Sequence, residues 1–361
     1  MFYHLLYPLR VYFSPLNVFG YISFRSIAAI ITSLMLSLFV GRRMIAYLKN
    51  IQAIQIIRSD GPASHHAKSG TPTMGGLIVL FNLAVSTLLW ARLDNRFILM
   101  CIACVLWLGL LGFLDDYFKI MKKNPKGILP KWKIAGQVVF ALGVGIYLYF
   151  FPANYGYPTS VNVPYLKDVF VEMGVLYILF CVLVIVASSN AVNLTDGLDG
   201  LAIGNLIICA FTYGLLAYIA GHSGLSQYLR ILPVSGAGEL TVLLSSMIGA
   251  GLGFLWFNGY PADVFMGDTG SLFLGGVIGL VAIFTRQEFI LVVVGGVFVI
   301  EALSVILQVF HFKRYRTRIF KMAPLHHHFE LSGWAEPKVT VRFWIIGIVL
   351  SLIALSSLKI R

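Results

Sequence analysis

The chain has 361 residues, of which 58% are apolar by the AVILMFWYC count and only 12% are charged. A soluble domain has roughly 25% charged residues, so this composition excludes a soluble globular protein, a disordered chain and a coiled coil. The net charge is +12. In a membrane protein, an excess of Lys and Arg indicates which loops lie on the cytoplasmic side, and it favours contact with anionic lipid or substrate. No nucleic acid partner is expected.

Apolar stretches of about 20 residues, the length that a helix needs to cross a bilayer, recur along the chain. Residues 1–20 are apolar and aromatic but are interrupted by Pro8, Arg10 and Pro15, so we expect an interfacial segment that the mature protein keeps. Ten membrane spans are then expected, at about residues 22–40, 75–91, 97–114, 132–151, 173–190, 201–221, 239–257, 269–285, 289–310 and 342–358. Since no connecting segment is long enough for a soluble domain, the sequence predicts one all-α, polytopic membrane domain over residues 1–361.

Lysine and arginine are distributed unevenly between the two sides of these spans. The chain has 27 of them, and 18 lie on the side of the loops that follow odd-numbered spans. By the positive-inside rule this side is cytoplasmic, which leaves both termini in the periplasm. The expected cytoplasmic loops cover about residues 41–74, 115–131, 191–200, 258–268 and 311–341. Nine of the 15 acidic residues also lie on this side and only Glu301 lies well inside a span, whereas an ion-driven transporter more often has carboxylates near mid-membrane.

The first acidic constellation is Asp115-Asp116, which we expect at the end of the third span. Carboxylates are favoured at the N-terminus of a helix, and the macrodipole opposes them at its C-terminus. Two acids at an unfavourable helix end therefore indicate a metal ion or a cationic partner. The alternative is a polar helix terminus at the membrane interface.

The second constellation follows the fifth span, where polar residues recur every three positions at Asn190, Asn193, Asp196 and Asp199. This spacing keeps them on roughly one side of a helix or turn, and the glycines among them allow a ligand to approach the backbone. The segment contains no Lys or Arg that could neutralise its acids. A ligand site is expected, with a loop capped by Asx turns as the alternative.

The third constellation leads into the eighth span through Gly267-Asp268. Thr269 and Ser271 are suitable capping residues, and a helix N-terminus attracts anions. An aspartate beside it can hold Mg²⁺, which takes one or two protein carboxylates together with phosphate oxygens and water. Phe265 is a candidate for stacking on a ring. The alternatives are an N-terminal charge cap for Asp268 and interface packing for Phe265.

Two basic constellations accompany the acids. The run His326–His328 follows the basic segment 313–318, and this setting favours phosphate or substrate contact over zinc, with a merely solvated loop as the alternative. Lys68 precedes the Gly- and Thr-rich segment 70–76, which resembles a phosphate loop only loosely. All five constellations lie on the expected cytoplasmic side. Carboxylates, cations and glycines together suit phosphoryl transfer between a lipid and a soluble anion.

Seven motifs follow one another along the chain: GTPTMGG, GFLDDY, NAVNLTDGLDGLA, GFLWFN, VFMGDTGSL, MAPLHHHFE and VRFWII. In order and spacing they resemble those of the phospho-N-acetylmuramoyl-pentapeptide-transferases, a family of polyprenyl-phosphate sugar-1-phosphate transferases, over essentially the whole chain. The resemblance implies a multi-pass protein of the bacterial cytoplasmic membrane, with ten helices, an active-site cleft facing the cytoplasm and a homodimer. It also implies a groove for the lipid tail near a bent ninth helix, in which Gly295-Gly296 suits the bend.

The resemblance implies an activity as well. It is the transfer of phospho-MurNAc-pentapeptide from UDP-MurNAc-pentapeptide to undecaprenyl phosphate, which gives lipid I and UMP and requires Mg²⁺. The resemblance makes Asp268 the Mg²⁺ ligand and a catalytic residue, with Asp115 and Asp116 beside it. The implied nucleotide and substrate contacts are Asn193, Asp196, Gly197, Leu198, Asp199, Asn258, Phe265 and Gln308. The further catalytic contacts that it implies are Lys68, His326, His327 and His328.

The sequence leaves the order of the chemical steps open. In one route the lipid phosphate attacks the donor phosphate that carries the sugar, and Asp115 or Asp116 deprotonates or orients the attacking phosphate. In the other route an aspartate attacks first and forms an acyl-phosphate. Because a phosphate monoester is largely ionised at pH 7, direct attack is favoured. A related GlcNAc-1-phosphate transferase and a lipid or solute transporter remain as alternative functions.

Overall fold

The computed structural model describes residues 1–53, 70–122, 127–166 and 169–360. Helices dominate, and one short antiparallel hairpin pairs Val161 with Val171. The elements in chain order are α1 (Phe2–Leu6), the 3₁₀ helices η1 (Tyr7–Val11) and η2 (Ser14–Gly20), α2 (Ile22–Asn50), α3 (Gly76–Trp90), α4 (Arg96–Met121), α5 (Pro130–Phe150), β1 (Ser160–Asn162), β2 (Phe170–Glu172), α6 (Leu176–Thr195), α7 (Leu201–Gly221), α8 (Ser223–Tyr228), α9 (Glu239–Asn258), α10 (Gly267–Phe284), α11 (Glu288–Val294), α12 (Gly296–Tyr315), α13 (Leu325–Glu330) and α14 (Glu336–Ile360).

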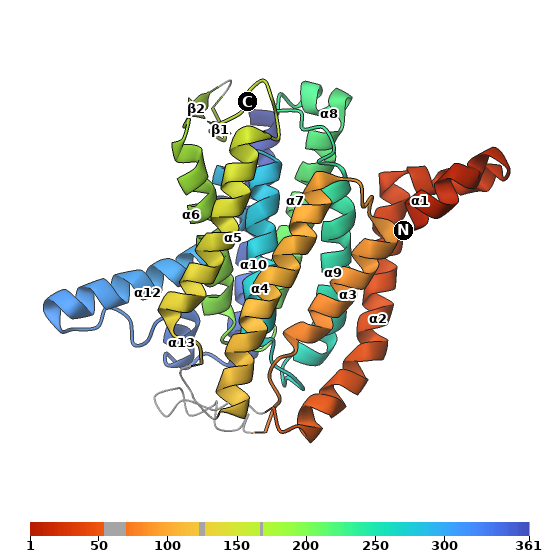
Figure 1. The fold of residues 1–361 in the computed structure, drawn as a ribbon. Coiled ribbons are helices and arrows are strands. Elements are labelled where there is room, and N and C mark those ends of the chain that lie inside the picture. The colour runs from red at the N-terminus through yellow and green to blue at the C-terminus, as the bar shows by residue number, and fades with distance from the viewer. Residues whose placement is uncertain (54–69, 123–126, 167–168, 361) are drawn as a thin grey trace.

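The helices form a bundle of membrane-spanning length (Figure 1). Among the described residues, nine helices are long and apolar enough to cross a membrane, and the shorter apolar helix α3 accompanies them. Each of the ten predicted spans coincides with helical structure. The predicted all-α, polytopic membrane protein is therefore confirmed, while the placement of both termini in the periplasm stays a prediction.

The predicted end of the third span is wrong. It was expected at about residue 114, but α4 continues to Met121. Asp115 and Asp116 consequently lie in the last two turns of a longer helix and not at its final residues. A helix does not stop where its apolar part stops, because its hydrogen bonds can continue into the polar interface.

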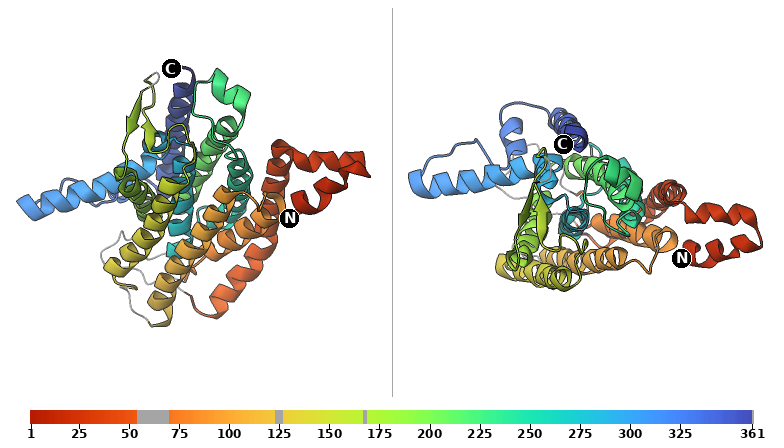
Figure 2. Two further views of the ribbon diagram at one scale, coloured as in Figure 1. Left: turned by 45° about the horizontal axis from the view of Figure 1, so that its top comes forward. Right: turned by 90° about the horizontal axis from the view of Figure 1, so that it is seen from above.

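The predicted ninth span consists of two helices. α11 ends at Val294 and α12 begins at Gly296, and Gly295 between them has a non-helical backbone (φ −86°, ψ 17°). The predicted bend at Gly295-Gly296 is confirmed. After it, α12 leaves the bundle sideways, and residues 2–20 project on the other side as three short helices (Figures 1 and 2). The interfacial placement of residues 1–20 stays a prediction.

The central helix of the bundle is α10. It packs against α4, α6, α3 and α7, and 89% of its residues are buried, as the view from above in Figure 2 illustrates. Small residues allow membrane helices to approach closely. A Cβ added to Gly275 of α10, for example, would lie only 2.8 Å from Cα of Ser189 in α6. This close packing fixes where the polar first turn of α10 lies relative to its neighbours.

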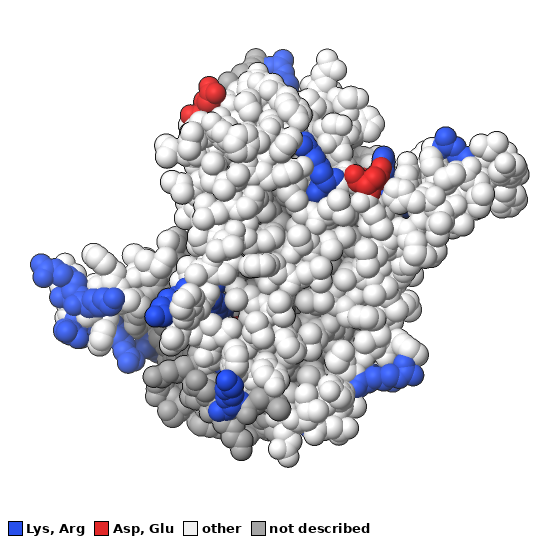
Figure 3. All heavy atoms as spheres, viewed as in Figure 1, with Lys and Arg blue, Asp and Glu red and all other residues white. Residues whose placement is uncertain are grey.

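The two ends of the bundle carry different features. The ends of α4, α6 and α9 and the start of α10 lie together at the lower end in Figure 1. Figure 3 shows a group of Lys and Arg at the tip of α12 and further ones at both the lower and the upper end of the bundle. At the upper end, Arg25 of α2 forms a buried bidentate ion pair with Glu239 of α9, with nitrogen–oxygen distances of 2.7 and 2.6 Å. The helix ends that carry the predicted acids thus lie at one end of the bundle, and a separate buried ion pair lies at the other.

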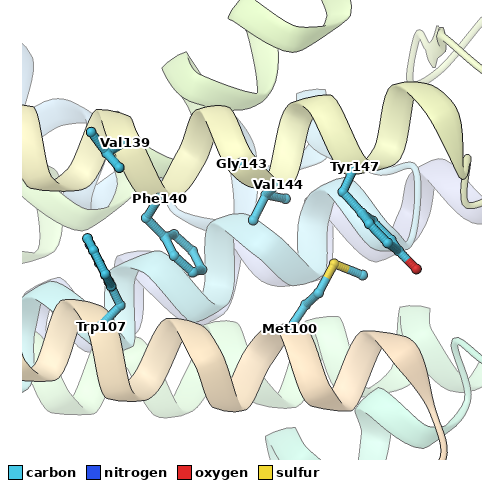
Figure 4. A pocket seen from close by; sticks show the side chains of 7 residues that line it. All are labelled: Met100, Trp107, Val139, Phe140, Gly143, Val144 and Tyr147. Atoms are coloured by element: carbon cyan, nitrogen blue, oxygen red, sulfur yellow. The ribbon is translucent and has the colours of Figure 1, made fainter.

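An apolar groove lies between α4 and α5, on the side of the bundle (Figure 4). Its volume is about 350 Å³, and it is lined by Met100, Trp107, Val139, Phe140, Gly143, Val144 and Tyr147. Neither an acid nor a Lys or Arg belongs to this lining. This groove therefore suits an apolar occupant, whereas a second pocket of about 390 Å³, at the end of the bundle that holds Glu239, has a charged lining that includes Arg92 and Asp94.

Candidate functional site

Three carboxylates from distant parts of the chain meet at the lower end of the bundle. Asp115 and Asp116 come from the last turns of α4, and Asp268 comes from the first turn of α10. Each offers an oxygen atom, and these atoms all lie within 4.8 Å of one another. The predicted proximity of the three residues is confirmed, while their catalytic roles stay predictions.

Asp116 binds the N-terminus of α10. One carboxylate oxygen accepts hydrogen bonds from the backbone N (2.8 Å) and the hydroxyl (2.7 Å) of Thr269, and the other accepts one from Asp268 N (3.2 Å). A helix N-terminus has free N–H groups and a positive partial charge, so it stabilises a carboxylate. Gly267 makes room for this contact, because its φ is +72° and an added Cβ would lie 2.7 Å from Asp116 Oδ2. The helix terminus that matters for the charge of Asp116 is therefore the favourable N-terminus of α10 and not the unfavourable C-terminus of α4.

Asp268 is bound by side chains of three other helices. Asn193 of α6 donates from Nδ2 to Asp268 Oδ1 at 2.7 Å and also to Ser271 Oγ at 2.8 Å. The other carboxylate oxygen of Asp268 lies 2.9 Å from Lys119 Nζ of α4 and 2.5 Å from Lys133 Nζ of α5. Four helices thus converge on one carboxylate.

The two lysines of this cluster were missed as site residues, because sequence reasoning counted them only toward topology. A signal existed for Lys119, which follows the acidic pair by three and four residues and so shares a helix face with it. It forms an ion pair of 2.6 Å with Asp115. For Lys133 the sequence carried no such signal, since its position depends on how α5 packs beside α4.

The donor set of the site fits a divalent cation. Carboxylate oxygens are the hard ligands that Mg²⁺ prefers, and Asp268 already binds two ammonium groups, so the site attracts positive charge. Both oxygens of Asp116 accept hydrogen bonds from the start of α10. Asp268 and Asp115 are therefore the better placed metal ligands. That the ion is Mg²⁺ stays a prediction.

The predicted nucleoside segment forms the turn between α6 and α7, next to the acidic cluster. Loss of contact with water raises the pKa of the Asp196 carboxyl to about 8, and the negative charges of Asp268 and Asp116 act in the same direction. Asp199 is buried, and its Oδ2 accepts a hydrogen bond from Ala262 N at 3.0 Å. The turn is thereby tied to the loop that leads into α10.

Several residues predicted to contact the nucleoside are engaged with the protein itself. Asn258 Oδ1 accepts a hydrogen bond from Gly200 N (3.1 Å), and its Nδ2 donates to Val264 O (2.9 Å). The Leu198 side chain is buried in an apolar cluster, and Phe265 is half-buried. Asn258 therefore joins two loops of the site, and the ligand contacts of these residues stay predictions.

The Gly- and Thr-rich segment 70–76 lies beside the loop before α10. Phe265 N donates to Pro72 O (2.9 Å), Gly75 N donates to Phe265 O (2.8 Å), and Gly76 N donates to Met266 O (2.8 Å). This backbone pairing brings the segment to the acidic cluster. Lys68, which was predicted as a charged catalytic residue, lies outside the described residues.

His326 connects the histidine segment with the nucleoside turn. It is fully buried, and its backbone N donates to Glu301 Oε1 at 3.1 Å. Its ring lies against Gly197, where an added Cβ would be 2.9 Å from Cε1 of the imidazole. The histidine run and the turn, about 130 residues apart in sequence, are therefore in direct contact.

The other polar residues predicted near the histidine run contact their own loop. His327 Nδ1 lies 2.9 Å from a glutamate of the same short helix, and His328 Nδ1 accepts a hydrogen bond from Lys321 N at 3.2 Å. Gln308 of α12 accepts from Phe320 N (3.0 Å) and donates to Phe320 O (3.1 Å). These bonds order residues 319–328, and contacts with a ligand stay predictions.

Family comparison agrees with a membrane bundle that carries acids at its helix ends. The model of glycosyl transferase family 4 matches residues 98–286, which is more than half of the chain. Signature 1 of the phospho-N-acetylmuramoyl-pentapeptide-transferases matches residues 68–80. Fold and site thus define a multi-pass membrane enzyme, a glycosyl transferase of family 4.

Relatives that match over their full length identify the family within this class of enzymes. The chain is 55% identical to the phospho-N-acetylmuramoyl-pentapeptide-transferase of Endomicrobium trichonymphae, 56% to that of Citrifermentans bemidjiense and 54% to that of Pelobacter propionicus, over the whole length of both chains in each case. The chain belongs to the phospho-N-acetylmuramoyl-pentapeptide-transferase family. The predicted family is confirmed, and neither the GlcNAc-1-phosphate transferase nor the transporter alternative is favoured.

Proposed function

We propose that the chain transfers phospho-MurNAc-pentapeptide from UDP-MurNAc-pentapeptide to undecaprenyl phosphate, with lipid I and UMP as products. The observation that carries this proposal is the meeting of Asp115, Asp116 and Asp268 within 4.8 Å, in a chain whose full-length relatives are transferases of that name. Phosphoryl transfer needs positioning and charge neutralisation more than a special nucleophile. Acids, lysines and a helix N-terminus at one point meet that need.

The proposed cofactor is Mg²⁺, held by Asp268 with Asp115 as the second carboxylate. When bound, it neutralises the charge of the donor diphosphate. Asp116 has a different task in this proposal, because it holds the first turn of α10 and with it the backbone of Asp268. Asp116 is thus a positioning residue for Asp268.

The attacking group in the proposed reaction is an oxygen of undecaprenyl phosphate. It forms a bond to the donor phosphorus that carries the sugar. The bond between that phosphorus and the oxygen of UMP breaks, and UMP leaves with the electron pair. Asp115 orients the attacking phosphate, which is largely ionised at pH 7 and needs no strong base. Trapping of a phosphorylated aspartate after incubation with the donor alone would overturn this direct route.

The lysines and the nucleoside turn complete the proposed site. Lys119 and Lys133 have flexible side chains that place positive charge beside Asp268, where the phosphates of the donor are expected. The turn that contains Asp196 binds the nucleoside. His326, which is fully buried and lies against that turn, supports it from below the surface.

The cellular setting of the reaction is also part of the proposal. The Lys- and Arg-rich end of the bundle faces the cytoplasm of a bacterial inner membrane, where a water-soluble UDP-linked donor is available and the carrier lipid is reached from the bilayer. A homodimer follows from the family resemblance. Membrane lipid surrounds the apolar faces of the bundle.

Release of UMP by the purified protein tests this function. With UDP-MurNAc-pentapeptide, undecaprenyl phosphate and Mg²⁺ present, we expect turnover by the unaltered chain and a loss of about 100-fold or more in Asp268→Ala, as for other removals of a group that stabilises transition-state charge. The melting temperature shows whether the variant keeps the fold. Turnover of a folded Asp268→Ala variant at the original rate would contradict the proposed site.

Two further arms of the same assay address the alternatives. Replacing the donor by UDP-GlcNAc distinguishes the related GlcNAc-1-phosphate transferase, since we expect UMP release only from the MurNAc-pentapeptide donor. Removal of the divalent cation by a chelator is expected to stop the reaction, and added Mg²⁺ is expected to restore it. Binding of the donor without any release of UMP would favour a transporter.

A further inference from the structure

One face of α14 meets the turn between α6 and α7. Glu336, Thr340 and Trp344 are four residues apart, so they share a helix face. The Glu336 carboxylate accepts a hydrogen bond from Asp199 N (2.9 Å), and the Thr340 hydroxyl donates to Asp199 O (3.2 Å). Trp344 Nε1 donates to Gly200 O (3.1 Å). Three successive turns of one helix thus bind the backbone of two adjacent residues.

This arrangement gives each backbone polar group of the two residues a partner. The remaining group, Gly200 N, donates to Asn258 Oδ1 at the end of α9. Buried backbone groups need such partners, because an unpaired one costs about as much as a lost hydrogen bond. Gly200 O also accepts a hydrogen bond from Gly204 N (3.0 Å) at the start of α7. Because α14 binds three of the four groups, among them both polar groups of the Asp199 backbone, the path of this turn depends on α14.

Apolar packing joins the same two parts of the molecule. Leu198 and Leu201, on either side of the bound residues, form a hydrophobic cluster with Val297, Val339 and Phe343 that is separate from the main core. Val339 and Phe343 belong to α14 and precede Thr340 and Trp344 by one residue each. The helix therefore packs against the flanks of the turn while it bonds to the backbone.

The Trp344 indole lies directly against glycine backbone. Gly200 has a φ of +74°, a conformation that residues with a Cβ rarely adopt. A Cβ added to Gly204 of α7 would lie 2.8 Å from Cζ2 of the Trp344 ring. The indole thus occupies space that only glycines at these positions leave open.

We propose that Glu336, Thr340 and Trp344 are positioning residues for nucleotide binding. They hold the backbone of Asp199 and Gly200, and through it the rest of the turn, in the conformation that receives the nucleoside, without touching the nucleoside themselves. The inference rests on the proposed function, in which this turn binds the donor nucleotide. It makes α14, whose outer face is exposed and apolar, part of the donor site.

Two variants that each remove one hydrogen-bond donor test this inference, one nearly isosteric and one that shortens the aromatic side chain. Thr340→Val removes the hydroxyl, and Trp344→Phe removes the indole N–H while keeping an aromatic ring. A hydrogen bond of this kind contributes about a 2- to 10-fold change in an equilibrium constant. We expect each variant to raise KM for the UDP-linked donor and Kd for UMP by about 3- to 10-fold. KM for undecaprenyl phosphate and kcat are expected to change by less than about 2-fold.

Matched controls come from other helix pairs of the same chain. Trp107 Nε1 donates to Gly136 O (2.9 Å) between α4 and α5, and Thr241 Oγ1 donates to Gly214 O (3.1 Å) between α9 and α7. Trp107→Phe and Thr241→Val therefore delete the same kinds of bond away from the turn. Their KM for donor and Kd for UMP are expected to stay within about 2-fold of the unaltered chain.

The outcomes separate this inference from the proposed function. UMP binding is measured by calorimetry without turnover, so it reports on the nucleotide site independently of the transfer reaction. Unchanged UMP binding in both α14 variants, or an equal loss in the Trp107 and Thr241 controls, would overturn the inference and leave the transfer reaction standing. Absence of UMP binding and of UMP release in the unaltered chain would overturn both.

Discussion

Three aspartates of identical chemistry have three different surroundings in this site. Asp116 is bound by the start of α10. Asp115 accepts a hydrogen bond from Ile128 N (2.7 Å) and pairs closely with Lys119 (2.6 Å) and more distantly with Lys133 (3.9 Å), whereas Asp268 pairs closely with both lysines. The Asp116 carboxylate is held at 2.7–3.2 Å by neutral N–H and O–H donors and lies 4.0 Å from the Lys119 ammonium, so its main contacts hold structure. A carboxylate that faces ammonium groups can exchange them for another cation.

Substitution of Thr269 tests whether Asp116 has the structural role described above. Thr269→Val keeps the shape of the side chain and removes its hydrogen bond to Asp116, and such bonds to charged groups contribute about 1.5–3 kcal/mol. We expect a lower melting temperature and a roughly 10-fold or larger loss in the rate of UMP release. Thr269→Ser retains the hydroxyl and is expected to keep most of the activity. Equal losses in the two variants would argue against a role for this bond.

At the level of residues, the sequence identified the acids but not what each one binds. Asp115, Asp116 and Asp268 stood out because charged residues are rare in this chain and because of where they fall relative to apolar stretches. Their hydrogen bonds run between helices, so they depend on the rotation and translation of α4 against α10. Neither composition nor spacing specifies those quantities. The same reason explains why Lys133 was missed.

At the level of elements, the contact between α4 and α10 decides where the acids meet. It is closest at Gly112, where an added Cβ would lie 2.8 Å from Cα of Thr269. The contact is made by backbone and leaves no flexible atom that could move aside. The distance between the acidic pair of α4 and the first turn of α10 therefore depends on a glycine one turn earlier.

Substitution of that glycine should displace the site. Gly112→Ala forces α4 away from α10, and overpacking of this kind costs about 1–3 kcal/mol. We expect a lower melting temperature and a loss of UMP release of about 10-fold or more, because the acids move apart. Gly143→Ala in α5 is the control, since nothing lies within 4 Å of its added Cβ. If both variants release UMP at the original rate, the contact does not set the site.

Hydropathy located the helices of the bundle but not their ends. It found the apolar part of α2 and α4, yet both helices continue for several residues past it, to Asn50 and Met121. The bend between α11 and α12 was predictable, because a Gly-Gly pair inside an apolar stretch weakens a helix locally. The sideways course of α12 after that bend was not predictable, since it depends on packing against several neighbours.

At the level of the whole molecule, the distribution of Lys and Arg predicts an orientation that labelling can test. The four cysteines of the chain are buried, so an introduced cysteine is the main target for a membrane-impermeant maleimide. Tyr155, beyond α5, is 72% exposed, and Lys122, after α4, is exposed at the opposite end. We expect Tyr155→Cys to react in intact spheroplasts and Lys122→Cys to react only after the membrane is permeabilised. The reverse pattern would invert the topology and place the acids outside.

The bonding of α14 to a turn made much earlier in the chain has a consequence for biosynthesis. A nascent polypeptide that has reached α10 already contains all three carboxylates, yet its turn at Asp199 still lacks the partners that residues 336–344 supply. If this turn binds the donor as proposed, only a chain translated past Trp344 and fully inserted completes that site. Prematurely terminated products would then insert into the bilayer without binding the UDP-linked donor.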